Sequence, residues 1–170
     1  QTVSPPTTTS EGMLGAVQDD VEKEVEAANA ASSGKIDIRP TVERGWGLFA
    51  LRDFDEGDFL MRANVLERKT EADSHSIQMG FDEHVIVDLP ARFINHRCNE
   101  ANVGVQLSED GFDFYAIRKI PKKTELLWDY ATTEYEVCTP FECSCGENCR
   151  GRMLGFRHHS EQVLESYGPK

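Results

Sequence analysis

Residues 92–102 read RFINHRCNEAN, and the rest of the chain is best understood outward from this polar stretch. Amide, imidazole and thiol side chains follow directly after the apolar pair Phe93 and Ile94, which can anchor them in a core. Polar side chains of this kind cost about 2–7 kcal/mol to bury without partners. We therefore expect them to bond to one another, to a ligand and to a metal.

The cysteines that follow favour a metal site over a disulfide framework. Cys143, Cys145 and Cys149 have the spacing Cys-x-Cys-x3-Cys, and Cys98 and Cys138 precede them. Cysteines separated by one residue are poor disulfide partners in a folded chain, whereas thiolates are good zinc ligands. Three thiolates leave one position of a tetrahedral zinc to be filled.

Short apolar segments on both sides of residues 92–102 predict a mainly β domain. Apolar residues alternate or cluster at 35–39, 48–51, 59–61, 85–87, 103–107, 112–117 and 126–128. Turn signals rich in Gly, Asp and Pro separate these segments about every ten residues, as in compact antiparallel β proteins. We find no internal repeat.

The N-terminal part differs in character. Residues 1–12 are rich in Pro, Thr and Ser, which predicts a flexible tail. Residues 13–31 carry valines at helical spacing and end at Ser-Ser-Gly, which predicts an amphipathic helix packed on the domain.

Composition narrows the functional classes. The 170 residues have a net charge of −12, with 39% apolar and 28% charged residues. No apolar run approaches the ~18 residues of a membrane span, and no secretory signal is present, so we expect no membrane partner. An acidic chain is a poor ligand for nucleic acid, but it suits a cationic partner such as a lysine-rich tail. Reduced cysteines indicate an intracellular protein, in the nucleus or the cytoplasm.

Four blocks of sequence, in this order, resemble the SET-domain protein lysine methyltransferases with a post-SET zinc segment. The blocks are RGWGLFA at 44–50, RFINHRC at 92–98, ELLWDY at 125–130 and CSCGENCRG at 143–151. The residues after 130 are most similar to the small stand-alone SET proteins. The resemblance implies a mainly β SET-type fold with knot-like C-terminal threading and a short N-terminal helix. It divides the chain into a tail and helix (1–34), a SET domain (35–136), a post-SET zinc segment (137–156) and a C-terminal extension (157–170).

The implied function is methyl transfer from S-adenosylmethionine to a lysine side-chain amine of a protein, such as a histone-like basic tail. The resemblance places the glycine turn and the Asn-His pair around the cofactor. The implied cofactor-binding residues are Arg44, Gly45, Trp46, Gly47, Asn95, His96, Tyr130 and Phe141.

Tyr130 is the implied catalytic residue, aligning the target amine with the methyl group. The nucleophile must be a neutral amine, and deprotonating a free lysine at pH 7 costs about 4.6 kcal/mol, because its pKa is about 10.4. A dry aromatic channel near a positive charge lowers that cost. Trp128 and His75 are the expected channel residues; Trp128 stands where the family places Tyr or Phe, so the number of methyl groups transferred stays open.

The resemblance offers Cys98 as the fourth zinc ligand beside Cys143, Cys145 and Cys149, with Cys138 as a competitor. Three further departures from the family pattern stand out. Arg97 replaces a serine, with one extra residue at Glu100-Ala101, and the cysteine loop is one residue short.

Two other functions remain open. The first is a catalytically weak or inactive SET module, in which Trp128, Arg97 and His75 close the channel and the surface binds a basic peptide. The second is an unrelated zinc protein, which would have no affinity for the cofactor.

Overall fold

The protein is described by a computed structural model that covers residues 10–169 and is mainly β. The strands are β1 (Ile36–Pro40), β2 (Trp46–Ala50), β3 (Phe59–Lys69), β4 (Ile77–Gly80), β5 (Glu83–Val87), β6 (Asn95–His96), β7 (Val103–Ser108), β8 (Gly111–Ala116), β9 (Glu125–Trp128), β10 (Phe141–Glu142) and β11 (Arg152–Met153). The helices are α1 (Ser10–Ala31), α2 (Phe156–Tyr167) and the short 3-10 helices η1 (Ala91–Phe93) and η2 (Tyr130–Thr132).

Strand β9 joins β1 and β2 to the rest of the main sheet, whose order is β1-β2-β9-β7-β8-β3-β5-β4. It pairs antiparallel with β2 and parallel with both β7 and β6. Its apolar run Leu126, Leu127 and Trp128 is buried, as expected for a strand covered on both faces. β9 is therefore inserted between β2 and β7, two strands that precede it in the chain.

The core lies around this sheet. Its largest fully buried apolar side chains include Leu48, Phe54, Phe114, Ile120 and Leu126. A smaller apolar cluster of Ala131, Met153 and Val163 joins η2, β11 and α2. It also holds Tyr130 and Phe141, so the C-terminal segment packs directly against the end of β9.

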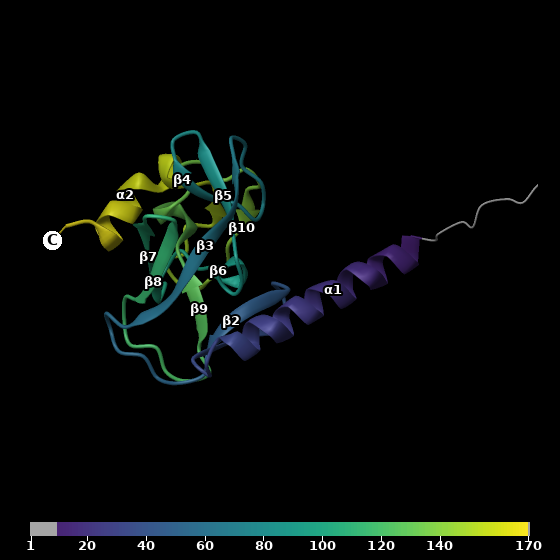
Figure 1. Ribbon diagram of the computed structural model, residues 1–170. Coiled ribbons are helices and arrows are strands. Elements are labelled where there is room, and N and C mark those ends of the chain that lie inside the picture. The colour runs from purple at the N-terminus through teal and green to yellow at the C-terminus, as the bar shows by residue number, and fades with distance from the viewer. Residues whose placement is uncertain (1–9, 170) are drawn as a thin grey trace, which may run out of the picture.

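Helix α1 begins at Ser10 and has 22 residues, so it is longer than expected. Residues 10–12 therefore belong to the helix and not to a flexible tail, while residues 1–9 lie outside the described part of the chain. Val25 is buried against the core near the C-terminal end of α1, as expected. Val21 and Ala28 also pack against the core, and the N-terminal part of the helix extends away from the β domain (Figure 1).

The C-terminal extension contains a helix that was not predicted, α2, on another side of the domain from α1 (Figure 1). β10 and β11 pair antiparallel and form a small separate sheet before α2. Among residues 10–169 there is no helix with both the length and the hydropathy that crossing a membrane requires.

Candidate functional site

The glycine turn and the Asn-His pair meet at strand β6. Asn95 lies beside Leu127 of β9, and its Nδ2 donates hydrogen bonds to the Trp46 carbonyl oxygen (3.0 Å) and to Glu125 Oε1 (3.0 Å). Gly47 is needed here, because a Cβ at this position would lie 2.8 Å from Glu125 Oε1 and 3.1 Å from Asn95 Nδ2. The close approach of the three residues fixes the Asn95 amide.

Arg44 adds a positive charge close to Asn95, on the other oxygen of Glu125. One terminal nitrogen of its guanidinium donates to Glu125 Oε2 at 2.7 Å, and the other donates to the His96 carbonyl oxygen at 3.4 Å. Glu125 therefore bridges Arg44 and Asn95 and orients both. Sequence reasoning assigned no role to Glu125, although it lies in one of the four blocks.

His96 is neutral and offers one unused hydrogen-bond donor. Burial, assisted by the charge of Arg150, lowers the pKa of His96 to about 3. Its Nδ1 accepts a hydrogen bond from the Tyr130 backbone N–H at 3.2 Å, which places the remaining ring proton on Nε2. Nε2 is buried and has no hydrogen-bond partner among the described residues. A buried donor of this kind is available to a ligand.

Arg44, Asn95 and His96 line a cavity of about 510 Å³, which we call the polar cavity. Its volume is within the range of about 300–1,000 Å³ that small-molecule sites occupy. Five predicted cofactor-binding residues line it: Arg44, Asn95, His96, Tyr130 and Phe141. The turn Gly45-Trp46-Gly47 does not line it directly; the Trp46 ring packs 6.2 Å from the ring of Phe93, and the turn reaches the cavity through Asn95.

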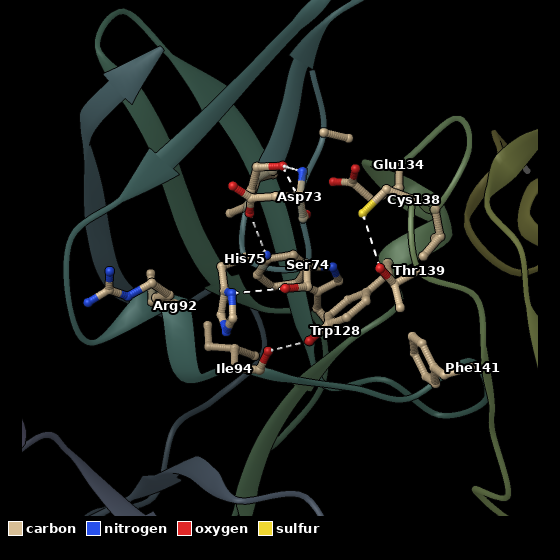
Figure 2. A pocket seen from close by; sticks show the side chains of 16 residues that line it. Asp73, Ser74, His75, Arg92, Ile94, Trp128, Glu134, Cys138, Thr139 and Phe141 are labelled. Carbon is tan, nitrogen blue, oxygen red and sulfur yellow. Dashed lines mark hydrogen bonds between the residues drawn. The ribbon is translucent and has the colours of Figure 1, made fainter. Parts of the chain in front are cut away.

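Tyr130 also lines a second cavity, which has a volume of about 270 Å³. Figure 2 shows this cavity with Trp128, Ile94 and Phe141 among its labelled lining residues. We call it the channel cavity. Its walls include the apolar side chains of Ile77, Ile94 and Val137, and both predicted channel residues, His75 and Trp128. Tyr130 and Phe141 line both cavities, so these two side chains stand where a ligand in one cavity would meet a ligand in the other.

Tyr130 is held firmly between the two cavities. Its hydroxyl donates to the Ile94 carbonyl oxygen at 2.9 Å, and its ring centroid lies 5.0 Å from those of His96 and Trp128. Burial raises the pKa of the Tyr130 phenol, so it stays protonated at neutral pH. It can orient a neighbouring group by hydrogen bonding, but it is a poor proton acceptor.

The two channel residues differ in their surroundings. Trp128 is 5% exposed, and its buried indole Nε1 has no hydrogen-bond partner among the described residues. His75 is exposed, and its Nδ1 lies 3.0 Å from Ser74 Oγ. Arg97, which was expected to help close a channel in an inactive module, lines the polar cavity and donates through Nε to the Asn99 carbonyl oxygen at 2.7 Å.

The structure gathers four of the cysteines into one cluster, Cys98 with Cys143, Cys145 and Cys149, and we call it the cysteine cluster. Cys98 Sγ lies 3.8, 3.4 and 3.6 Å from the sulfurs of the other three. A tetrahedral zinc with Zn–S bonds of about 2.3 Å would hold its sulfurs about 3.8 Å apart, so the donor set fits zinc. Cys138 is exposed and lies outside the cluster, and the short cysteine loop still brings its sulfurs together.

A buried ion pair connects the cysteine cluster to the end of β9. Arg150, which follows the last ligand-type cysteine, pairs with Asp129, and both side chains are at most 6% exposed. Arg150 also donates its backbone N–H to Cys98 Sγ at 3.2 Å, and Asp129 accepts from the Ala131 backbone N–H at 3.2 Å. The residue before Tyr130 is thereby tied to the cluster. Both residues lie in the quoted sequence blocks, but sequence reasoning gave neither of them a role.

Comparison with known proteins identifies the family. Residues 45–131, more than half of the chain, match the model of the SET domain. Similar proteins include histone-lysine N-methyltransferase SUVR4 of Arabidopsis thaliana, 28% identical over 150 residues that cover 65% of this chain and 30% of the relative. Human histone-lysine N-methyltransferase SETD2 is 26% identical over 141 residues, which cover 71% of this chain and 6% of the relative.

Solved structures confirm the predicted mainly β SET-type fold. A crystal structure of KRYPTONITE in complex with mCHG DNA and SAH has a TM-score of 0.57 at 23% identity, over 69% of this chain and 28% of that chain. A KRYPTONITE complex with mCHH DNA, H3(1-15) peptide and SAH has a TM-score of 0.57 at 22% identity, over 69% and 29%. The chain spans less than a third of these relatives. Because the family match runs from the glycine turn to the residue after Tyr130, the chain belongs to the SET domain family.

Proposed function

We propose that the protein transfers a methyl group from S-adenosylmethionine to a lysine side-chain amine of a protein substrate. The observation that carries this proposal is the position of Tyr130, which lines both the polar cavity and the channel cavity. A two-substrate transfer needs two sites that meet at one point, and holding the reactants there supplies much of the acceleration. The histone-lysine methyltransferase relatives support the same reaction.

The polar cavity is the proposed cofactor site. When bound, S-adenosylmethionine supplies an electrophilic methyl group on a positively charged sulfur. Arg44 and the Asn95 amide can face its amino acid end, and the free Nε2–H of His96 can donate to it. Phe141 closes the cavity on the side of the cysteine cluster. Related structures that hold SAH support this assignment.

The channel cavity is the proposed lysine site, and Tyr130 is the proposed catalytic residue. Because its hydroxyl donates to the Ile94 carbonyl oxygen, the hydroxyl oxygen keeps lone pairs that can accept from an amine N–H. This contact would aim the amine lone pair at the polar cavity. Tyr130 orients the nucleophile and takes no proton, since burial raises its pKa.

The cysteine cluster is the proposed zinc site. Zinc would be structural there, because four protein ligands leave no open coordination position. Its proposed effect is to hold Cys143 against the polar cavity and Phe141 against both cavities. Backbone N–H groups of Arg150 and Gly151 lie 3.2 and 3.4 Å from Cys98 and Cys149 sulfurs, which stabilises thiolates.

The proposed substrate is a lysine-bearing basic segment, such as a histone tail. A net charge of −12 favours a cationic partner over nucleic acid. One similar structure holds an H3(1-15) peptide, and the relatives are histone-lysine methyltransferases, which supports an intracellular reaction in the nucleus or cytoplasm. The channel cavity beside Trp128 supports an active enzyme over the inactive module, in which that space would be closed.

The test is methyl transfer from labelled S-adenosylmethionine to H3(1-15) peptide and to mixed core histones. We expect label on lysine with the unaltered chain. Tyr130→Phe should lower kcat by about 10²-fold or more, because it loses the group that orients the amine. Cofactor affinity, measured by calorimetry, should change little in this variant.

Two results would contradict the proposal in different ways. Tight cofactor binding without any transfer would favour the peptide-binding module. An absence of cofactor binding would favour a zinc protein unrelated in function to the methyltransferases.

A further inference from the structure

One carboxyl group in the channel cavity has no role in the mechanism so far. Glu134 lies four residues after Tyr130 and lines the channel cavity together with Trp128 and Tyr130. Figure 2 shows its carboxyl group on the upper side of this cavity, with Ile94 on the lower side. A charged carboxyl group inside a largely apolar cavity is costly unless it has a hydrogen-bond or ion-pair partner.

The protein fixes one oxygen of Glu134 and leaves the other available. Oε1 accepts the backbone N–H of Gln78 at 2.9 Å and the hydroxyl of Thr133 at 3.3 Å. The Gln78 side chain in turn accepts the Tyr135 backbone N–H at 2.7 Å, so Gln78 of strand β4 holds both the Glu134 side chain and the backbone of the next residue. Among the side chains that the structure describes, those of residues 20–169, Glu134 has no lysine or arginine partner, and its side-chain hydrogen bonds all use Oε1.

The environment of Glu134 makes it a much better proton acceptor than an ordinary glutamate. Burial raises its pKa to about 7 against the usual 4.5, although the Gln78 and Thr133 hydrogen bonds oppose the shift. The charge of Glu134 also contributes to the raised pKa of Tyr130, so the two groups share one electrostatic environment.

Two of the other ionisable groups around this cavity already have charged partners. The pKa of Asp73 is lowered by its bond to Lys69, and Arg92 pairs with Glu24. The groups that line the cavity besides Glu134 are Asp73, His75, Arg92, Tyr130 and Cys138.

We propose that Glu134 accepts the proton that the target lysine must lose before methyl transfer, an inference that rests on the proposed function. An N–H bond of the ammonium breaks, its electron pair stays on nitrogen, and an O–H bond forms on the Glu134 carboxylate. The neutral amine then attacks the methyl carbon of S-adenosylmethionine: an N–C bond forms as the S–CH3 bond breaks, the electron pair of that bond stays on sulfur in the neutral thioether that leaves, and the methylated amine carries the positive charge. Glu134 is only partly buried, so it returns its proton to water before the next turnover.

The pKa values of lysine and of Glu134 determine how favourable the proton transfer between them is. Only about one free lysine in 2,500 is neutral at pH 7, because its pKa is about 10.4. Moving the pKa of the acceptor from 4.5 to about 7 makes the proton transfer about 300-fold more favourable. A charged carboxylate at this position also attracts the incoming ammonium, so one group serves binding and then deprotonation.

The decisive experiment compares Glu134→Gln with Glu136→Gln. Glutamine keeps the oxygen that accepts from Gln78 but cannot take a proton. Glu136 is exposed two residues further on and pairs with Arg157. For transfer to H3(1-15) peptide, we expect kcat of the unaltered chain to rise with pH and level off near pH 7.

Glu134→Gln should reduce kcat at pH 7 by about 30-fold or more, and its kcat should keep rising about tenfold per pH unit above pH 7. The Glu136→Gln profile should match that of the unaltered chain. An unchanged pH profile in Glu134→Gln, in a variant that binds cofactor normally, would overturn the inference while leaving the proposed function intact.

A second measurement needs no turnover. Calorimetry with n-butylamine at pH 7, in buffers of different ionisation enthalpy, reports protons released on binding. The unaltered chain should release about half a proton, because Glu134 is about half protonated when free and shares one proton with the amine when bound. Glu134→Gln should release none. If the unaltered chain methylates nothing, the proposed function fails, and this binding measurement still decides whether Glu134 is the partner of an amine.

Discussion

At the scale of single residues, Gly47 shows how little room the site leaves. A Cβ there would lie 2.7 Å from Thr41 Cγ2 and 2.8 Å from Glu125 Oε1, both closer than real Cβ contacts. Gly47→Ala should therefore displace Glu125 and Asn95, cost about 1–3 kcal/mol of stability, and weaken cofactor binding by tenfold or more. Thermal unfolding and calorimetry with SAH measure the two effects.

Gly80→Ala is the matched control for Gly47→Ala. A Cβ at Gly80 would make ordinary contacts of 3.4 and 3.5 Å with the side chain of Glu83, far from Asn95. This variant should bind SAH like the unaltered chain. Equal SAH affinity in Gly47→Ala would show that the turn does not position the cofactor site.

At the scale of elements, Asn102 holds strand β9 in place as a short strand would. Its Oδ1 accepts the Leu127 backbone N–H at 2.8 Å, and its Nδ2 donates to the Glu125 carbonyl oxygen at 2.9 Å. Asn102→Ala would leave these buried groups unpaired, at about 1–3 kcal/mol for each. We expect a clear loss of stability in denaturant unfolding, together with weaker cofactor binding because Glu125 shifts.

Asn64→Ala is the control at this scale, since the substitution removes one exposed side-chain hydrogen bond, from Asn64 Nδ2 to Asp88 Oδ2 at 2.7 Å. It should change the free energy of unfolding by less than about 1 kcal/mol. A stability loss in Asn102→Ala no larger than this would mean that β9 is held by packing alone.

The strands that the sequence predicts are those with apolar residues at alternate or successive positions, such as β1, β7 and β9. β3 is longer than predicted. Its last residues, Glu67 to Lys69, are charged, so no apolar pattern marks them, and pairing with β5 holds them in the strand although they are not buried. α2 was missed because its polar start hides the spacing of its few buried residues, His159 and Val163.

The residues of the candidate site also fall into two groups, those that the sequence pattern predicts and those that only the structure reveals. Asn95, His96, Tyr130 and the cysteines lie in compact blocks, so the sequence alone draws attention to them. Glu134 becomes important only because Gln78, 56 residues earlier, meets it in space. Arg150 likewise acquires its role from Asp129, which no local pattern reveals.

At the scale of the whole molecule, the cysteine cluster ties the stretch before β7 to the segment between β10 and β11. Cys98 and Cys149 are 51 residues apart, and Phe141 is carried by the segment that they hold. Cys98→Ser should lose bound zinc, increase hydrogen exchange over residues 141–153, and weaken SAH binding by about 10–100-fold. Elemental analysis, exchange mass spectrometry and calorimetry measure these effects.

Cys138→Ser is the control, because Cys138 is exposed and outside the cluster. It should keep one zinc per chain and the exchange pattern of the unaltered protein. Zinc retained in Cys98→Ser but lost in Cys138→Ser would reverse the assignment of the fourth ligand.

The position of β9 between β2 and β7 also affects how the chain folds during synthesis. The ribosome produces β1 and β2 first and the block from β3 to β8 next, yet the strand that joins these two parts comes only at residues 125–128. Until β9 has been synthesised, β2 and β7 lack the strand that pairs with both of them. Because pairing between distant segments is slow to form, completion of the fold waits for the last third of the chain.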